Sequence, residues 1–269
     1  MAGSAIITKR LPSFEGVAAS STATLRIPRG FTYHDIFITY ANALADMTEI
    51  RVLANGTVFQ RFSATQLDAL NRFYGDAAAS GVLTLHFDRQ GVRTRAAKEI
   101  TAVGTGPRSE LNPNPIETFT IEVDLSATAS PALSAIARVS EAGPAGVIRK
   151  VLQFSHTAGG SGEFQISDFP KRDVILASHH QSSQISQLLI EKNNFTIFDR
   201  TLAENAVVLP DGDFPRTVQS NYFHYDPAEV GYGRQFLVTA DASDLRYRFT
   251  MGAGATINSM IEYMGPVSG

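Results

Sequence analysis

The six histidines are the residues best suited to metal binding or acid–base chemistry, and their spacing supports neither. They are His34, His86, His156, His179, His180 and His224. None forms an H-x-x-x-H or H-E-x-x-H pattern, the spacings that bring two imidazoles to one metal ion on a helix. His179 and His180 end a predicted strand, where successive side chains point to opposite faces. We therefore predict an ordinary strand-end pair and no shared metal site.

Carboxylates, serines and glycines give no stronger indication of catalysis or metal binding. The acidic loops Asp211–Asp213 and Asp241–Asp244 offer fewer oxygens than calcium requires, so turn formation explains them. Ser155 and Ser178 each precede a histidine, but a nucleophile and its base must meet in space, which adjacency does not show. Gly159–Gly162 predicts a flexible tip, because no helix start follows it to bind phosphate. We assign no catalytic, cofactor-binding or metal-binding residue and expect no enzyme.

Charged residues are sparse and scattered. The chain has 269 residues, of which 18% are charged, and its formal net charge is −3. This balance argues against a protein that coats nucleic acid, which needs clustered Lys and Arg, so we expect no direct sequence-specific nucleic-acid binding. Asp88 and Asp124 end predicted strands without an identifiable partner carboxylate. The densest basic group is expected to be a solvated loop and comprises Arg89, Arg93, Arg95 and Lys98.

Cysteine is absent from the sequence. Its absence excludes disulfides, thiolate catalysis and zinc or iron–sulfur sites built on cysteine. No apolar run approaches the roughly 18 residues of a membrane-spanning helix, and the N-terminus lacks the basic stretch of a signal peptide. We expect a soluble protein of a cytoplasm-like compartment, stabilised by packing and by assembly.

The elements that carry these residues are mostly short strands, and one arrangement occurs twice. In its first copy, the strand Glu49–Leu53 leads through Asn55–Gly56, a pair suited to a type I′ turn, into the strand Thr57–Phe62. Ser63 and Gln66 then form a capping-box pattern, which predicts a short helix.

The second copy follows 138 residues later, measured from Asn55 to Asn193. Leu188–Ile190 matches the first strand, and Asn193–Asn194 matches the turn. Thr201 with Glu204 forms the second capping box, and a proline ends that helix. A unit of this length is too long for a solenoid repeat. We therefore infer two domains of one fold in one polypeptide.

Two further segments extend the match between the halves. Asp35–Ile38 aligns with Asp173–Leu176 at the same spacing. Ile121–Glu122 aligns with Ile261–Glu262 at a spacing two residues longer. The alignment thus predicts corresponding strands before and after the hairpin.

Short strand-like runs, about eight in each half, are typical of sandwiches or jelly rolls. Glu99–Val103 is expected to be a strand, and Leu133–Val139 to be a strand or a short helix. We predict an all-β protein of two tandem eight-stranded jelly-roll β-barrels, each with a short helix after a β-hairpin. The turn-rich segment Glu141–Gly146 is the best linker, which places the first jelly roll in residues 1–142 and the second in 143–269.

Several stretches are distinctive in composition and in their order along the chain. They are Arg10–Phe14, Leu25–Tyr33, Gly81–Phe87, Pro131–Ala137 and Ile261–Gly265. Together with the duplicated fold, these stretches resemble the double jelly-roll major capsid proteins of corticoviruses, the membrane-containing icosahedral bacteriophages.

The resemblance implies a structural protein of the virion capsid that is assembled in the host cytoplasm. Three chains would give six similar barrels around one axis, a pseudo-hexameric homotrimer that fills near-hexagonal positions of an icosahedral shell. The resemblance also implies contacts with neighbouring capsomers, with a penton or vertex protein, and with an internal viral membrane or its minor proteins. Some relatives bind calcium, but this sequence shows no ligand motif that can be transferred.

The alternative is a viral spike or receptor-binding protein with two β-domains. Tyr222, Phe223 and Tyr225 would favour it if they were exposed in a loop, although they fit a strand better. A β-rich hydrolase is disfavoured because no acid–base pair has credible spacing. Leu70 and Ile190 are predicted core residues, so replacing either with Asp is expected to prevent trimer formation through misfolding.

Overall fold

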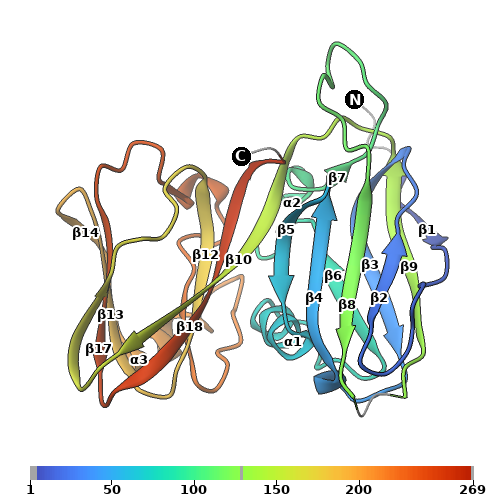
Figure 1. The fold of residues 1–269 in the computed structure, drawn as a ribbon. Coiled ribbons are helices and arrows are strands. Elements are labelled where there is room, and N and C mark those ends of the chain that lie inside the picture. The colour runs from blue at the N-terminus through green and yellow to red at the C-terminus, as the bar shows by residue number, and fades with distance from the viewer. Residues whose placement is uncertain (1–4, 128–129, 268–269) are drawn as a thin grey trace.

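Two β-barrels stand side by side, one formed by each half of the chain (Figure 1). The computed structural model describes residues 5–127 and 130–267. The strands of the first half are β1 (Ile7–Arg10), β2 (Thr22–Arg26), β3 (Phe31–Tyr40), β4 (Met47–Ala54), β5 (Thr57–Phe62), β6 (Val82–His86), β7 (Val103–Gly104), β8 (Phe119–Leu125) and β9 (Leu133–Glu141). Those of the second half are β10 (Val147–Ala158), β11 (Gly162–Ile166), β12 (Val174–Gln181), β13 (Ile185–Lys192), β14 (Phe195–Thr201), β15 (Tyr222–Tyr225), β16 (Leu237–Val238), β17 (Leu245–Met251) and β18 (Ala255–Pro266). The helices are α1 (Ala64–Phe73), α2 (Arg95–Glu99) and α3 (Leu202–Val208), and the short 3₁₀ turns are η1 (Leu44–Asp46) and η2 (Gly233–Gln235).

The strand pairing of the first half recurs in the second. The first half pairs as β1-β9-β3-β6, with β7 beside β3, and as β2-β8-β4-β5. The second half pairs as β10-β18-β12-β15, with β16 beside β12, and as β11-β17-β13-β14. Each strand is thus replaced by the one nine places later, which is the topology of two jelly rolls in tandem. The predicted double jelly roll is confirmed, with one two-residue strand, β7 or β16, added in each half of the described chain.

Irregularities in the ladders are duplicated along with the strands. The β4–β5 ladder shifts register between Val52 and Leu53, and the β13–β14 ladder shifts between Ile190 and Glu191, at a spacing of 138 residues. A β-bulge leaves one residue unpaired and bends its strand, so its position is specified by the local sequence. A shared bulge at the predicted spacing confirms that the two hairpins correspond residue by residue.

The turns and caps adopt the predicted conformations. Asn55 and Asn193 both have φ of 52°, in the left-handed region that a type I′ turn requires. Ser63 and Thr201 are the N-caps of α1 and α3. In each capping box the hydroxyl accepts a hydrogen bond from the backbone N–H three residues later, and that residue's side chain accepts one from the N-cap N–H.

The alignment of Asp35–Ile38 with Asp173–Leu176 is wrong by four residues. Tyr33 pairs with β7 as Ile175 pairs with β16, so counterparts in β3 and β12 are 142 residues apart. The turn η1 adds residues after β3 that the loop after β12 lacks. A bulge in each strand reverses the alternation of side chains, so the 138-residue spacing matches the partly exposed Phe37 with Ile175, which is buried in the second core.

The match of Ile121–Glu122 with Ile261–Glu262 is also wrong, because the two segments lie in different strands. Ile121 belongs to β8 and pairs with Val52, whereas Ile261 belongs to β18. The residue that pairs with the counterpart of Val52 is Tyr247 of β17. Strand β8 alternates buried and less buried residues, whereas β18 is buried without interruption from Ser259 to Tyr263, so the shared Ile-Glu pair alone does not identify the strand.

The segment Glu99–Val103 is not a strand. Its first residue ends α2, which begins after Thr94, whose hydroxyl accepts a hydrogen bond from the backbone N–H of Ala97. Only the two residues of β7 follow as a strand. The ambiguous segment Leu133–Val139 is strand, as part of β9. A local helix cap therefore determines the structure at the start of the first segment. Pairing with strands on both sides determines that the second segment is a strand.

Each barrel has an apolar core, and the first core extends into the second half of the chain. Its cluster includes four side chains from beyond the linker, namely Ile148, Val151, Tyr222 and Met260. The cluster of the second barrel contains residues of the second half alone. Leu70 and Ile190 are buried, as predicted. Among the described residues, no helix is long and apolar enough to cross a membrane.

Candidate assembly interface

The second barrel covers one edge of the first. Strand β10 lies parallel to β5, with Val151 opposite Gln60, and joins four strands from each barrel into one continuous path of a sheet. The Gln60 side-chain Nε2 donates a hydrogen bond of 3.0 Å to the backbone oxygen of Arg149. The edge that β5 would otherwise expose is therefore paired within the chain.

The C-terminal end of α1 is also covered by the second barrel. The ring of Phe73 stacks on His224 with centroids 4.3 Å apart and meets His179 edge-on at 4.9 Å. The backbone N–H of Thr217 donates to the Phe73 oxygen at 2.9 Å. Helix α1 thus fixes the position of one barrel relative to the other.

A buried cluster of charges holds the loop after β6 against the second barrel. Arg89 Nη2 lies 3.2 Å from one Asp226 oxygen, and Arg216 Nε lies 2.8 Å from the other. Arg216 also donates to the backbone oxygen of Gly91 at 2.9 Å. At Gly91, where φ is +70°, a Cβ atom would lie 2.4 Å from the Arg216 guanidinium, so only glycine fits. Arg89 is fully buried, and the expectation that its segment is a solvated loop is wrong at that residue.

Glu262 is the centre of a second buried cluster. Its carboxylate accepts hydrogen bonds from Tyr74 Oη at 2.7 Å, Arg149 Nε at 2.5 Å and His179 Nε2 at 2.8 Å. Burial favours the neutral acid, but the charge of Arg149 and the hydrogen bond from His179 keep the pKa of Glu262 well below its usual value. Burial also raises the pKa of the Tyr74 phenol well above its usual value. The carboxylate is therefore ionised and fully partnered, as a buried charge must be.

The hydrogen bonds of His224 fix the protonation of two histidines. The backbone N–H of Gln219 donates to His224 Nε2 at 3.2 Å, so the proton of the neutral ring lies on Nδ1. That Nδ1 is 2.8 Å from Nδ1 of His179, which must accept, and the His179 proton therefore points to Glu262. Burial, with His179 nearby, lowers the pKa of His224 well below its usual value. These hydrogen bonds thus orient both rings at the junction of the barrels.

The predicted histidine pair at the end of β12 is confirmed as a pair facing opposite ways. His179 is directed to the barrel junction, as described above. His180 instead contacts the hydroxyls of Ser178 and Ser259, at 2.9 and 2.8 Å. The two adjacent rings therefore lie in separate polar environments, as the alternation of a strand requires.

Within the part of the chain that the structure describes, one group of three residues could supply ligands to a metal ion, formed by His34, Asp88 and Glu99. His34 Nδ1 lies 3.0 Å from both Asp88 oxygens, and its Nε2 lies 2.9 Å from Ser140 Oγ. Glu99 pairs with Arg95. Asp88 thus has a neighbouring carboxylate that sequence reasoning missed. Two carboxylates and an imidazole, each already partnered, fall short of a calcium coordination shell.

The face of the second barrel formed by β14 and α3 is uncovered, unlike its counterpart formed by β5 and α1. Ile197 is 40% exposed, whereas Phe59 at the matching position is 2% exposed. Val207 is 74% exposed, whereas Ala69 is 5% exposed. Single exposed apolar residues are ordinary, but a contiguous group marks an interaction surface. We call this group the β14–α3 face, and it consists of Phe195, Ile197, Leu202, Val207 and Val208.

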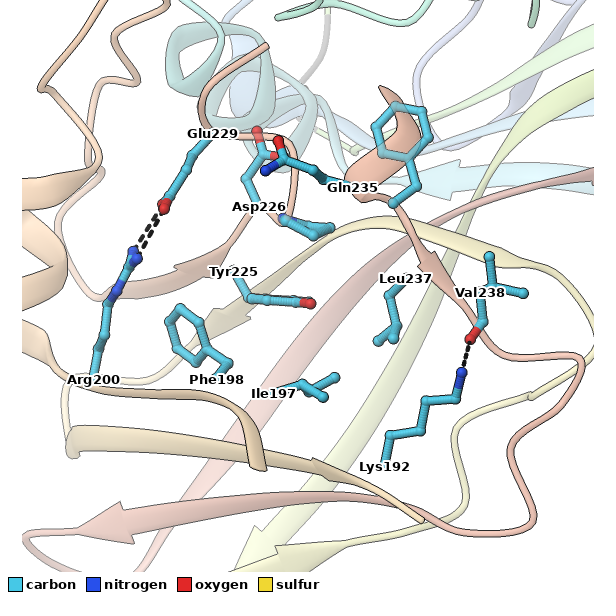
Figure 2. A pocket seen from close by; sticks show the side chains of 12 residues that line it. Lys192, Ile197, Phe198, Arg200, Tyr225, Asp226, Glu229, Gln235, Leu237 and Val238 are labelled. Atoms are coloured by element: carbon cyan, nitrogen blue, oxygen red, sulfur yellow. Dashed lines mark hydrogen bonds and ion pairs between the residues drawn. The ribbon is translucent and has the colours of Figure 1, made fainter. Parts of the chain in front are cut away.

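A pocket of about 470 Å³ adjoins this face, between β14 and the segment that follows β15. Figure 2 shows Ile197, Phe198 and Tyr225 along its floor, and ion pairs or hydrogen bonds at its ends. Both oxygens of Glu229 lie 2.8 Å from the Arg200 guanidinium, and these charges are therefore already satisfied. The lining is thus mixed, with apolar side chains of β14 and β15 beside paired charges and other polar groups.

The aromatic residues that would favour a spike protein are not exposed. Tyr222, Phe223 and Tyr225 all lie in β15 and are buried. The strand interpretation of these residues is confirmed, and the main support for the spike alternative is removed.

Sequence reasoning missed the buried charges at the junction and the exposed face. Arg89, Arg216 and Glu262 stand in no motif, so nothing in the sequence joins them. The exposed face did leave a signal, because Ile197 and Val207 occur at positions where the first half also has apolar residues. The matched patterns concealed that only one copy is covered.

Two sequence families match the chain, and structural comparison agrees with them. The N-terminal domain of viral coat protein P2 matches residues 8–140, and its C-terminal domain matches residues 148–267. No protein among the curated sequences matches significantly. The major capsid protein P2 of bacteriophage PM2 is 22% identical with a TM-score of 0.89, over 97% of this chain and 98% of that one.

Two further solved structures share the fold at lower identity. The STIV major capsid protein is 10% identical with a TM-score of 0.69, over 97% of this chain and 96% of that chain. PBCV-1 VP54, fitted into a reconstruction of the virophage Sputnik, is 9% identical with a TM-score of 0.69, over 97% of this chain and 94% of its own. At these identities the likeness shows the architecture of the fold.

Proposed function

The chain belongs to the viral coat protein P2 family, and from that premise we propose that it is the major capsid protein of an icosahedral virus whose capsomer is a homotrimer. It is a structural component of the virion capsid, and no enzymatic role is assigned to it. Three chains place six barrels of one topology around an axis and give a pseudo-hexameric capsomer. Such a unit tiles near-hexagonal positions of a closed shell.

One observation carries the trimer, namely the exposed β14–α3 face. In the first barrel the matching face is closed by the second barrel of the same chain. In the second barrel it stays open and apolar. Closed cyclic symmetry lets one surface be used repeatedly without growth into a filament. In a trimer, each exposed β14–α3 face would be covered by the first barrel of the next copy. The two barrels of each copy divide near residues 142 and 143.

The remaining partners follow from this role in the shell. Neighbouring capsomers, a penton or vertex protein, and an internal membrane or its minor proteins are the proposed contacts, with assembly in the host cytoplasm. The support for them is the family membership. The structure assigns no residue to these contacts.

Sedimentation velocity of the purified chain tests the proposal. We expect one species of three times the 29.1 kDa chain mass at micromolar concentration. Images of that species should show a pseudo-hexagonal outline. A monomer at every concentration, together with no trimer in assembled particles, would overturn the proposal.

A further inference from the structure

Six strands end the three sheets of the described chain, and β1 and β14 are the two whose counterparts, β10 and β5, meet between the barrels. Strand β1 ends one sheet of the first barrel, and β14 ends one sheet of the second. Figure 1 places them at the two outer sides, with β5 and β10 between the barrels. An unpaired edge exposes a row of backbone donors and acceptors that another strand can join. A head-to-tail contact between such edges closes a ring.

The chain itself contains the template for this contact. Strand β10 is the counterpart of β1, and β5 is the counterpart of β14, as the shared pairing order shows. Within the chain, β10 lies parallel to β5, with Val151 opposite Gln60. A second copy can therefore bring β1 against β14 in the same way.

The ladders identify the residues that would meet. Gln60 pairs with Val52, and Phe198 pairs with Ile190, its counterpart, so Phe198 occupies the position of Gln60.

The other side of the contact follows from the β1–β9 and β10–β18 ladders. Val151 pairs with Glu262, and Glu262 pairs with Ala177 just after a register shift. Thr8 pairs with Arg138, and Arg138 pairs with Asp35 just after the corresponding shift. Thr8 therefore occupies the position of Val151.

We propose that β1 of one copy lies parallel to β14 of the next, with Thr8 opposite Phe198, and that three such contacts close the capsomer. This inference rests on the proposed homotrimer and specifies its interface. The occupant is thus a second copy of this chain, and its β1 completes the sheet β11-β17-β13-β14.

The chemistry of both edges fits this register. In a parallel pair the next residues along each strand are Lys9 and Asp199, which carry opposite charges. The residues before Thr8 are Ile6 and Ile7, both apolar and exposed. In this register Ile7 lies opposite Ile197, an apolar residue that lines the pocket shown in Figure 2.

Cysteine cross-linking tests the register, because the natural chain contains no cysteine. The double variant Thr8→Cys with Phe198→Cys is oxidised as assembled trimer and run on a non-reducing gel. We expect covalent dimers and trimers, and a weaker yield from Thr8→Cys with Thr196→Cys, which is two residues out of register. Gln60→Cys with Val151→Cys is the positive control and should cross-link within one chain.

The outcomes separate the two proposals. A trimer in sedimentation that gives no intermolecular cross-link, while the Gln60–Val151 control does, overturns the register and leaves the trimer standing. A higher yield from the Thr196 pair also overturns the register. Failure to sediment as a trimer, by the unmodified chain, overturns the proposed function itself.

A charge exchange provides a test that leaves Phe198 intact. Lys9→Glu and Asp199→Lys should each weaken the trimer, raising its dissociation constant by about fivefold for each of its three contacts, the effect of one exposed ion pair. The two changes together should restore the natural value. Absence of restoration in the double variant contradicts the proposed neighbours.

Discussion

The two barrels have one topology but opposite relations to their surroundings. In the first, the hairpin β4–β5 and helix α1 are closed off by β10 and by buried charges. In the second, the hairpin β13–β14 and helix α3 face outward with apolar side chains. Helix α1 buries seven residues, whereas α3 buries only Asn205. The comparison teaches that a duplicated fold can identify an interface. The contact that covers a surface in the first barrel indicates what kind of partner covers the matching surface in the second.

Introducing a carboxylate at apolar positions should give the largest difference in unfolding free energy between matched residues of the two barrels. Leu70→Asp places an unpaired carboxylate at a buried position of α1 and should cost more than about 4 kcal/mol, enough to prevent folding. Ile190→Asp should do the same in the second barrel. Val208→Asp, at the counterpart of Leu70, should leave monomer stability within about 1 kcal/mol while abolishing the trimer.

Chemical denaturation and sedimentation of the three variants check this prediction. Normal soluble trimer from Leu70→Asp or Ile190→Asp would contradict the burial of these side chains. Normal trimer from Val208→Asp would contradict the assignment of α3 to the interface.

The junction between the barrels should be the next most sensitive region. Asp226→Asn leaves Arg89 and Arg216 buried without a counter-charge and should cost about 3–5 kcal/mol of unfolding free energy. Asp213→Asn removes an exposed partner of Arg93 and should cost less than about 1 kcal/mol. Equal losses from the two variants, measured by denaturant unfolding, would argue that the junction charges do not hold the barrels together.

The barrels should also respond to acid with opposite signs. Burial, with His179 and His156 nearby, lowers the pKa of His180 to about 3, so its neutral form stabilises the fold and this stability falls as pH drops below about 6.5. His86 is buried too, but hydrogen bonds to Asp35 and Asp76 raise its pKa. Its contribution is complete below about 6.5 and is lost as pH rises through the raised value.

Unfolding free energies at about pH 7.5 and about pH 5 should reveal this contrast. Relative to the natural chain, His180→Gln should lose less stability on acidification, by a few kcal/mol, because each pKa unit is worth about 1.4 kcal/mol. His86→Gln should lose more. The same sign for both variants would show that the histidine environments do not differ as described.

The smallest effects should be equal in the two barrels. Ser63→Ala and Thr201→Ala each remove one N-cap hydroxyl and should each cost about 1 kcal/mol of unfolding free energy. Their local geometry is the same, with a complete capping box in each helix. A loss at Ser63 several times that at Thr201 would mean that burial, and not the cap, dominates at α1.

Local chemistry made the duplicated hairpin and helix predictable. Asn55 and Asn193 specify turns, and Ser63 and Thr201 specify helix starts, because each acts on backbone within a few residues. The strand register before the hairpin was misjudged because η1 adds residues between β3 and β4, and their number is set by how the chain packs rather than by a local motif. The segment after Glu99 was misjudged because the cap at Thr94 outweighed its β-branched residues.

The interface itself could not be predicted from sequence. Asp226 and Arg89 are 137 positions apart, and their contact depends on how one barrel rests on the other. The exposure of Ile197 also depends on packing, since Phe59 in the matching position packs against Phe87 and Phe119 in the first core. The sequence shows which residues are charged or apolar. Which residues contact one another depends on how the sheets pack.

The central claim is that the β14–α3 face is covered by a second copy of the chain. A single thiol at Val207→Cys measures this directly, with Ser161→Cys in the exposed tip between β10 and β11 as the matched control. In assembled trimer, a maleimide reagent should label Ser161→Cys readily and Val207→Cys at least tenfold more slowly, with both labelled equally after denaturation. Equal labelling of the two thiols in the native assembly would contradict the account.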